Sequence, residues 1–353
     1  MPRVAIAMSG GVDSSVAAAM LVEQGYEVIG LMLRLWSEPG TQESNRCCTP
    51  AAMDVARRVA ARLGIPFYAI DGQQVFYDIV VNYFVDGYTQ SRTPNPCLVC
   101  NRFIRWEYLF QHARAFGADF LATGHYARIA LDSHGVNRLI RAKDMNKDQS
   151  YVLHILNQEL LAHTLFPVGA YLKSEVRDIA LRFGLPAAQR RDSQDLCFLA
   201  GGDYRDFLVR NNNMPENPGP ILNNAGEVLG QHRGLAFYTI GQRKGLAISH
   251  PFPLYVLEKD YQHNALVVGT SEQLGSQELY ADRVNWISGA PPRQAFMAQV
   301  KIRYRAKDIP GEVFPLDDQQ IQIKFSAPVR DITPGQAAVL YQEDVCLGGG
   351  IIQ

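Results

Sequence analysis

Short runs of apolar residues alternate with amphipathic stretches over roughly the first 200 residues of the chain. The apolar runs, which are typical of strands, lie at 4–8, 28–33, 67–70 and 120–122. The amphipathic stretches lie at 14–24, 51–63 and 105–116. In the second of these, Val55, Val59 and Leu63 recur every fourth residue, which places them on one face of a helix. Strands that alternate with helices of this length predict an α/β fold, a doubly wound parallel sheet with helices on both faces.

Three glycines separate predicted helices from predicted strands. Gly25, Gly64 and Gly117 each follow an amphipathic stretch and precede an apolar run. Glycine adopts the left-handed backbone conformation at little cost, so it commonly ends a helix. We therefore expect all three to act as C-terminal caps.

The pattern changes after about residue 205. Residues 211–220 are rich in Asn, Pro and Gly and are typical of a linker. Short strand-like runs follow at 255–257, 265–268, 296–302, 321–325 and 337–341. Closely spaced short strands predict a small β-barrel or sandwich. We expect three domains: an α/β domain at 1–205, a small central domain at 206–271 and a C-terminal β-barrel at 272–353.

Composition narrows the class of protein. Lys and Arg total 34 and Asp and Glu total 35, and this balance excludes a uniformly basic nucleic-acid coat. No apolar run approaches the roughly 18 residues of a membrane span, and the first eight residues are too short for a signal peptide. Six cysteines in 353 residues are too sparse for a disulfide scaffold. We expect a cytoplasmic protein with reactive or metal-bound thiols.

Residues 9–15, Ser-Gly-Gly-Val-Asp-Ser-Ser, follow the first predicted strand and open the first predicted helix. Gly10 and Gly11 allow backbone N–H groups to approach a pyrophosphate, and the helix N-terminus favours the anion. Ser14 adds a hydroxyl donor, and Asp13 can hold Mg²⁺. The string is neither a Walker A loop nor a Gly-x-Gly-x-x-Gly fingerprint. A tight turn with a serine cap is the structural alternative to nucleotide binding.

The cysteines are unevenly placed. Cys97 and Cys100 lie in a proline-stiffened loop that leads into a helix, and Cys197 lies far along the chain. The helix dipole and nearby arginines lower the pKa of a thiol placed like Cys100. Structural zinc would need a second Cys-x-x-Cys pair, which the sequence does not contain. Cys346 falls in a probable strand and is expected to be core.

Basic residues suggest contact with RNA. Lys301, Arg303, Arg305 and Lys307 alternate on a predicted strand, with Tyr304 between them. Same-side cations at a spacing of two can follow a phosphate backbone, and a tyrosine can stack on a base. A charged edge strand that prevents aggregation is the alternative.

The loop 9–15 resembles the PP-loop of ATP pyrophosphatases. Over essentially the whole chain, an ordered set of motifs is similar to the family of tRNA-specific 2-thiouridylases. Besides the loop, the motifs lie at 92–96 with 100–101, 122–126, 146–151, 165–167, 192–193 with 197–198, 241–246, 303–305, 333–336 and 346–350.

The resemblance implies a PP-loop, HUP-like catalytic domain and an enzyme. ATP would adenylate the C2 oxygen of a wobble uridine, and a persulfide sulfur from a donor protein would replace that oxygen. Cys197 matches the persulfide carrier, and Cys100 matches the cysteine that attacks it, releasing sulfide or leaving a disulfide. Residues that match ATP contacts are Ala7, Met8, Ser9, Gly10, Gly11, Val12, Asp13, Ser14, Leu33 and Gly124. Residues that match tRNA contacts are Asn95, Pro96, Cys97, His125, Lys147, Asp148, Gln149, Arg303, Tyr304 and Gln336. Arg190-Arg191 and Arg243-Lys244 are further cations of this kind.

One position departs from the family pattern. Many members carry Asp where this chain has Cys97, so the resemblance leaves two accounts of the site. Cys97 either replaces an acid that orients the base or Cys100, or it joins Cys100 and Cys197 as ligands of a [4Fe-4S] cluster with one open iron. The added third thiolate favours the cluster.

Two other classes of function remain as alternatives. The chain could be another PP-loop adenylating ligase or synthase, or an RNA-binding module with a vestigial nucleotide site. The first needs neither paired cysteines nor a basic β domain, and the intact loop 9–15 argues against the second.

Overall fold

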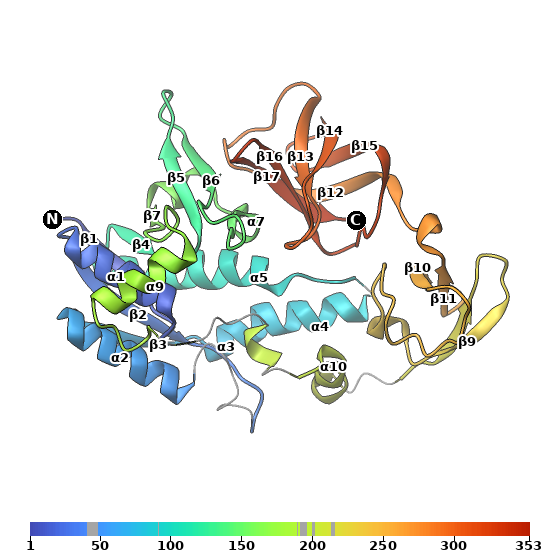
Figure 1. Ribbon diagram of the computed structural model, residues 1–353, viewed down its shortest axis with the longest axis horizontal. Helices are drawn as coiled ribbons and strands as arrows, with labels where there is room; N and C mark the ends of the chain where they lie inside the picture. The colour runs from blue at the N-terminus through green and yellow to red at the C-terminus, as the bar shows by residue number, and fades with distance from the viewer. Residues whose placement is uncertain (41–48, 91, 189, 191–195, 200–201, 213–215) are drawn as a thin grey trace.

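The computed structural model describes the whole chain except residues 41–48, 91, 189, 191–195, 200–201 and 213–215. A five-stranded parallel sheet occupies the N-terminal part, in the order β3-β2-β1-β4-β7 (Figure 1). Its strands are β1 (Arg3–Ala7), β2 (Glu27–Arg34), β3 (Phe67–Asp71), β4 (Phe120–Ala122) and β7 (Thr164–Leu165). The four apolar runs predicted as strands are all confirmed.

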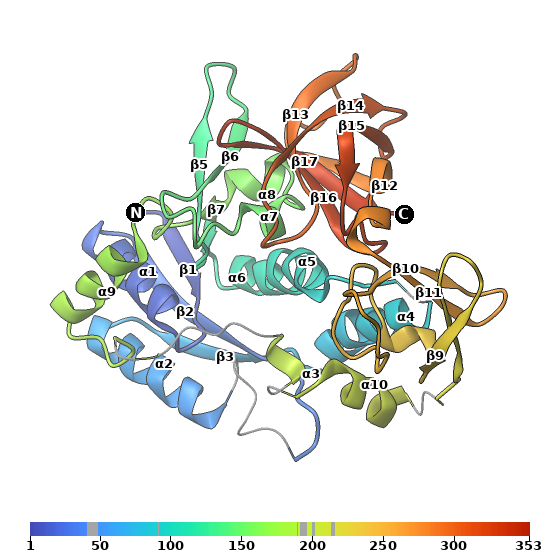
Figure 2. The ribbon, with the colours of Figure 1, turned by 45° about the vertical axis from the view of Figure 1, so that its right-hand side comes forward.

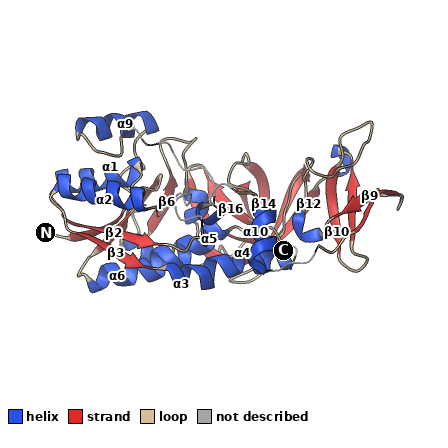
Figure 3. Ribbon diagram, turned by 90° about the horizontal axis from the view of Figure 1, so that it is seen from below, coloured by secondary structure: helices blue, strands red, loops and turns tan. Residues whose placement is uncertain are grey.

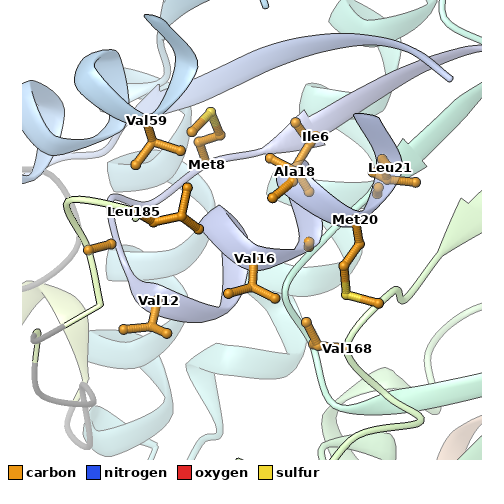
Figure 4. Packing of buried hydrophobic residues seen from close by; sticks show 14 of the residues in the cluster. Ile6, Met8, Val12, Val16, Ala18, Met20, Leu21, Val59, Val168 and Leu185 are labelled. Carbon is orange, nitrogen blue, oxygen red and sulfur yellow. The ribbon is translucent and has the colours of Figure 1, made fainter. Parts of the chain in front are cut away.

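Helices cover both faces of this sheet, as the doubly wound prediction requires (Figure 3). One face carries α1 (Val12–Glu23), α2 (Pro50–Leu63) and α9 (Lys173–Arg182). The other face carries α3 (Gln73–Phe76), a π-helical stretch η2 (Cys100–Leu109) and α6 (Phe110–Ala115). Alternation along β1 explains the two layers, because Ile6 and Met8 pack with α1 and α2 (Figure 4), whereas Ala5 and Ala7 pack with η2 and α6.

The predicted glycine caps are confirmed. Gly64 adopts φ +67° at the end of α2 and donates its N–H to the carbonyl of Ala61. Gly25 and Gly117 follow α1 and α6 with φ of +82° and +75°. Each reverses the chain toward the next strand of the sheet.

The helix that carries two of the cysteines begins earlier than its amphipathic pattern indicates. It starts with α5 (Pro96–Val99) and continues through η2 and α6. Asn95 caps its start by accepting a hydrogen bond from the N–H of Cys97, and Pro96 occupies the first helical position. Cys97 and Cys100 therefore lie in the first turns of a helix rather than in a loop before one.

The C-terminal part forms a closed barrel, which excludes the sandwich alternative. Its strands follow the order β12-β15-β14-β13-β16-β17, and β12 pairs again with β17. They are β12 (Ser276–Trp286), β13 (Phe296–Lys301), β14 (Ile309–Pro315), β15 (Ile321–Val329), β16 (Ala337–Gln342) and β17 (Val345–Ile352). A hairpin from the catalytic part, β5 (Ala127–Leu131) and β6 (Asn137–Arg141), extends the barrel because β6 pairs with β17. Figure 2 shows this hairpin beside the barrel.

Between these parts in the sequence comes a four-stranded sheet in the order β10-β11-β8-β9, which lies at the end of the molecule away from the parallel sheet (Figure 3). Its strands are β8 (Gly219–Leu222), β9 (Val228–His232), β10 (Tyr255–Asp260) and β11 (Ala265–Gly269). The remaining helical segments are η1 (Tyr77–Val81), α4 (Asn82–Thr89), α7 (Ser150–Leu153), α8 (Gln158–Ala162), η3 (Cys197–Leu199), α10 (Tyr204–Asn212), η4 (Leu235–Phe237) and η5 (Ser271–Gln273). Within the described ranges, no helix combines the length and the apolar character that crossing a membrane requires.

Two apolar cores cross from one part of the chain to another. One contains Trp106 and Tyr151 of the catalytic part together with Val339 and Tyr341 of the barrel. The other joins α4 to the four-stranded sheet. Cys346 on β17 belongs to the first core and is 1% exposed, as the sequence predicted. Burial raises the pKa of its thiol to about 12.

The predicted basic strand at 301–307 is wrong. β13 ends at Lys301 and β14 begins at Ile309, and the chain turns between them, with the N–H of Ala306 on the carbonyl of Arg303. The Arg303 guanidinium is drawn inward by the carbonyl of Ile240 and the hydroxyl of Thr333. The alternation of charge therefore reflects residues of a turn and not the pleat of a strand.

Candidate active site

The residues expected to bind ATP gather at the carboxyl ends of two neighbouring strands. The loop 9–15 follows β1, and Thr123, Gly124 and His125 follow β4. β1 lies between β2 and β4, where the direction of strand order reverses. Open α/β sheets bind ligands at this switch point. Ala7 and Met8 are buried beside it, and Leu33 lies near the end of β2.

The loop itself is held in shape by its own serines. The hydroxyl of Ser15 donates to the carbonyl of Gly11 at 2.7 Å, and the N–H of Ser9 donates to the hydroxyl of Ser14 at 3.2 Å. Gly10 has φ +70°, and a Cβ there would lie 2.3 Å from the carbonyl oxygen of Ala52. The first backbone N–H groups of α1 lack intrahelical partners, so this end of the helix is suited to an anion.

Asp13 is the charged centre of the loop. Nζ of Lys173 lies 2.6 Å and 2.8 Å from its two carboxylate oxygens. The hydroxyl of Tyr126 donates to the same carboxylate at 2.8 Å. Because the Asp13 side chain remains 32% exposed, it can serve as the one carboxylate that Mg²⁺ commonly takes beside substrate phosphates.

Lys173 was not among the residues predicted for the site, although the sequence carries a signal for it. It is the first residue of α9, where a cation opposes the helix dipole. Such a placement needs a compensating anion, and Asp13 supplies it across 160 positions of sequence. The α9 helix is thereby fixed to the loop.

Gly124 lies directly against the start of α1. A Cβ at this position would be 2.6 Å from the backbone nitrogen of Ser14 and 2.8 Å from the carbonyl carbon of Asp13. The end of β4 can approach the loop this closely only because residue 124 has no side chain.

His125 faces the cysteine-bearing helix. Its ring centroid lies 5.6 Å from that of Trp106 on η2, and its Nδ1 lies 2.8 Å from the hydroxyl of Thr123. Burial, and next the charge of Arg105, lowers the pKa of His125 well below its ordinary value. The imidazole is therefore neutral at neutral pH and acts as a hydrogen-bonding group.

The segment before the cysteines is fixed by the other two domains. Thr93 donates its N–H to the carbonyl of Pro334 at 2.8 Å, and its carbonyl accepts from the Gln336 amide at 2.7 Å. The hydroxyls of Thr93 and Thr239 lie 3.3 Å apart. Gln336, expected at the RNA, is thus placed by the structure against the chain that leads to Asn95 and Pro96.

Of the three thiols, Cys97 is exposed and Cys100 and Cys197 are half-buried. Cys100 and Cys197 pack against the same apolar core. The next residue, Phe198, fixes the segment that bears Cys197, because its ring lies 5.2 Å from that of Phe84 on α4. Residues 191–195, part of a motif that carries the resemblance, and Cys47 and Cys48 lie outside the described residues.

The expected cluster does not fit the site in the described conformation. Among the residues that the structure describes, no three His, Cys, Asp or Glu side chains are grouped so that they could hold a metal ion. This includes Cys97, Cys100 and Cys197, all of which are described. A cluster would require the segments that carry them to rearrange.

Several expected tRNA contacts already have partners inside the protein. The carboxylate of Asp148 is buried and accepts from the N–H groups of Ala142 and Ser150. The side-chain oxygen of Gln149 accepts from the N–H of Tyr126 at 2.9 Å, which connects this loop to Asp13. Lys147 beside them is half-buried.

Some side chains of the turn after β13 point into the protein, and others are exposed to solvent. Arg303 points inward to Ile240 and Thr333, as described above. Tyr304 is 38% exposed, and Arg305 and Lys307 are exposed. The external members of the turn are the ones accessible to a large ligand.

Three family models match successive parts of the chain. They are described as a tRNA methyl transferase HUP domain at residues 2–201, a tRNA methyl transferase PRC-barrel domain at 205–270 and an aminomethyltransferase beta-barrel domain at 276–352. Curated relatives match almost end to end and are called tRNA-specific 2-thiouridylase MnmA. The one from Natranaerobius thermophilus is 48% identical over 99% of this chain and 97% of its own. The one from Moorella thermoacetica is 49% identical over 99% of this chain and 98% of its own.

Substituting Gly124 tests the close approach of β4 to the loop. We expect Gly124→Ala to lower ATP affinity at least about tenfold and stability by about 1–3 kcal/mol, because the methyl group must displace the backbone of Asp13 and Ser14. Calorimetric titration with ATP and thermal unfolding measure the two effects. Gly230→Ala on β9 is the matched control, since its Cβ would meet only ordinary contacts. Wild-type ATP affinity in Gly124→Ala would contradict this account of the loop.

Proposed function

The chain belongs to the family of the tRNA-specific 2-thiouridylases, and we propose that it replaces the C2 oxygen of a tRNA wobble uridine with sulfur at the expense of ATP. The observation that carries the proposal is that a phosphate-binding loop and a pair of cysteines are held by the same sheet. A loop suited to phosphates lies at the switch point of the sheet, and the helix that bears Cys97 and Cys100 packs on the other face of the same sheet through Trp106.

The first step is adenylation. The C2 oxygen of the uridine attacks the α-phosphorus of ATP, an O–P bond forms, and the bond from that phosphorus to the pyrophosphate oxygen breaks. The N–H groups of the loop 9–15 hold the phosphates. Mg²⁺ held by Asp13 would neutralise part of their charge. The adenylated oxygen becomes a good leaving group, which leaves as AMP.

The second step is sulfur transfer. A sulfur-donating protein converts the Cys197 thiol to a persulfide. The terminal sulfur of this persulfide attacks C2 of the uridine as AMP departs. The Cys100 thiolate then attacks Sγ of Cys197, which frees the sulfur on the base and leaves a Cys100–Cys197 disulfide. A thiol reductant restores both cysteines. The packing of Cys100 and Cys197 against one core supports this pairing.

Recognition of tRNA is proposed for the surface that joins the catalytic part to the barrel. Asn95, His125, Lys147 and Gln149 belong to its catalytic side, and Pro96, which is buried, supports that side from within. The exposed Tyr304, with Arg305 and Lys307, continues it on the barrel. In this arrangement Arg303 and Gln336 support the surface from within.

The remaining classes of function find less support. A ligase or synthase of another kind would not need the three cysteines or the barrel that clamps Thr93. An RNA-binding module would not need the ordered loop around Asp13. Mass spectrometry of wobble uridines from cells that lack the protein separates these classes, because loss of 2-thiouridine is expected only for the proposed enzyme.

Serine at Cys100 or at Cys197 keeps the size of the side chain and removes the soft thiolate. We expect either variant to lose 2-thiouridine formation by at least about 100-fold while pyrophosphate release from ATP and tRNA continues. Cys346→Ala is the matched control, because that thiol is buried in the core and away from the proposed chemistry. Full thiolation by Cys100→Ser or Cys197→Ser would refute the pairing.

Cys97→Asp distinguishes the two accounts of Cys97. Since the three thiols are not grouped for a metal in the described structure, we expect this variant to keep thiolation within about threefold of the wild type. Iron and sulfide analysis of anaerobically purified protein accompanies the activity assay. Stoichiometric iron that Cys97→Asp loses together with activity would establish the cluster account instead.

We expect the turn after β13 to bind tRNA through contacts with the phosphate backbone. We expect Lys307→Ala to weaken tRNA binding and to reduce the dependence of log affinity on log salt by about 0.7–0.9. Binding measured over a range of salt concentrations gives the slope. Lys324→Ala on β15 is a control of the same charge elsewhere on the barrel. An unchanged slope in Lys307→Ala would remove this turn from the RNA surface.

A further inference from the structure

Arg190 reaches the phosphate loop from a distant part of the chain. Its Nη1 donates to the carbonyl oxygen of Gly10 at 3.1 Å, across 180 positions of sequence. The residue is half-buried. The sequence grouped Arg190 with the cations that contact tRNA, whereas the structure places it at the loop expected to bind ATP.

The position of Arg190 is fixed by the segment that carries it. Leu185 is buried in the same core as Met8 and Val12 of the loop region, and Figure 4 shows its side chain beside them. Arg177 on α9 donates from Nη1 to the carbonyl of Arg190 itself at 3.3 Å. The backbone that carries the guanidinium is therefore anchored beside the loop.

Two cations, Lys173 and Arg190, lie at the loop, and among the described residues they differ in their partners. Lys173 is neutralised by Asp13 at 2.6 Å. Within the described residues no carboxylate pairs with Arg190, and the structure gives its guanidinium one acceptor, a neutral carbonyl. An arginine has five N–H donors in a planar fork that matches phosphate oxygens. Among the residues that the structure describes, this half-buried cation with spare donors has no carboxylate partner, and it lies beside a loop that favours anions.

We propose that Arg190 is an ATP-binding residue that contacts the β- and γ-phosphates, a role that rests on the proposed function. During adenylation the bond between the α-phosphorus and the pyrophosphate oxygen breaks, and negative charge accumulates on the leaving pyrophosphate. The guanidinium donates hydrogen bonds to that charge and transfers no proton. Arg190 thereby acts on the leaving group, opposite the side from which the uridine oxygen attacks.

Nucleotides of different phosphate number test the proposal. We expect Arg190→Gln to lower ATP affinity about 10- to 100-fold, the size typical of a lost charge-assisted hydrogen bond, and to lower AMP affinity less than about threefold. The ATP affinity of Arg190→Lys, which keeps the positive charge and loses the planar fork of donors, should lie between those of the wild type and Arg190→Gln. Calorimetric titration with ATP and with AMP, without tRNA, gives both values. Arg182→Gln is the control, since that arginine pairs with Glu23 on the surface.

Two other binding results would overturn the proposal. Equal losses for ATP and AMP would mean that Arg190 only shapes the loop through Gly10. Unchanged ATP affinity together with weaker tRNA binding would make it the tRNA contact that the sequence suggested. The binding test is independent of thiolation. If the wild type formed no 2-thiouridine while Arg190→Gln still selectively lost ATP, the proposed function would fail and the role of Arg190 would stand.

Discussion

The backbone of Thr93 is where the three parts of the molecule meet. Its N–H and its carbonyl are both bonded to the barrel, through Pro334 and Gln336, and its hydroxyl faces Thr239 of the central domain. Gly335 between them has φ +92°, and a Cβ there would lie 3.0 Å from the backbone of Thr93. Only a glycine allows the barrel to enclose the segment so closely. The helix with Cys97 and Cys100 begins at Pro96, directly after this segment, so the contact fixes where that helix starts.

The three domains follow one another in the sequence, but their cores and sheets pack together across the domain boundaries. The catalytic sheet contributes a hairpin to the barrel, and Arg141 of that hairpin is buried with its guanidinium 3.6 Å from the ring centroid of Tyr341 and 2.7 Å from the carboxylate of Asp308. Because Arg141 is buried whereas Asp308 is partly exposed, removing Asp308 would leave a buried guanidinium without its counter-charge, which is the costly case. The interfaces are thus suited to holding the thiols at a fixed distance from the phosphate loop.

The sequence predicted those features that local pattern determines. The buried strands β1 to β4 appear as continuous apolar runs, and Gly64 ends its helix as expected. β14 was not predicted, because Pro310 interrupts it, and β17 was expected only around Cys346, because Gly348, Gly349 and Gly350 follow. Pairing with neighbouring strands is what makes both of them full strands. The basic turn after β13 was misassigned for the opposite reason, since alternation every second residue imitates a pleat. The contacts of Lys173 and Arg190 join residues more than 150 positions apart, so no local pattern identifies their partners.

The place of β17 along the chain has a consequence for how the protein reaches its folded state. β17 closes the barrel onto β12 and also pairs with β6, whose hairpin belongs to the catalytic part. During synthesis that hairpin and the apolar surface around Tyr151 emerge about 200 residues before the strand that covers them. Long-range pairing of this kind is slow, and an uncovered edge favours association with other chains. The nascent protein therefore passes through a prolonged stage in which its catalytic half exposes an unpaired strand, and chaperones are expected to matter most at that stage.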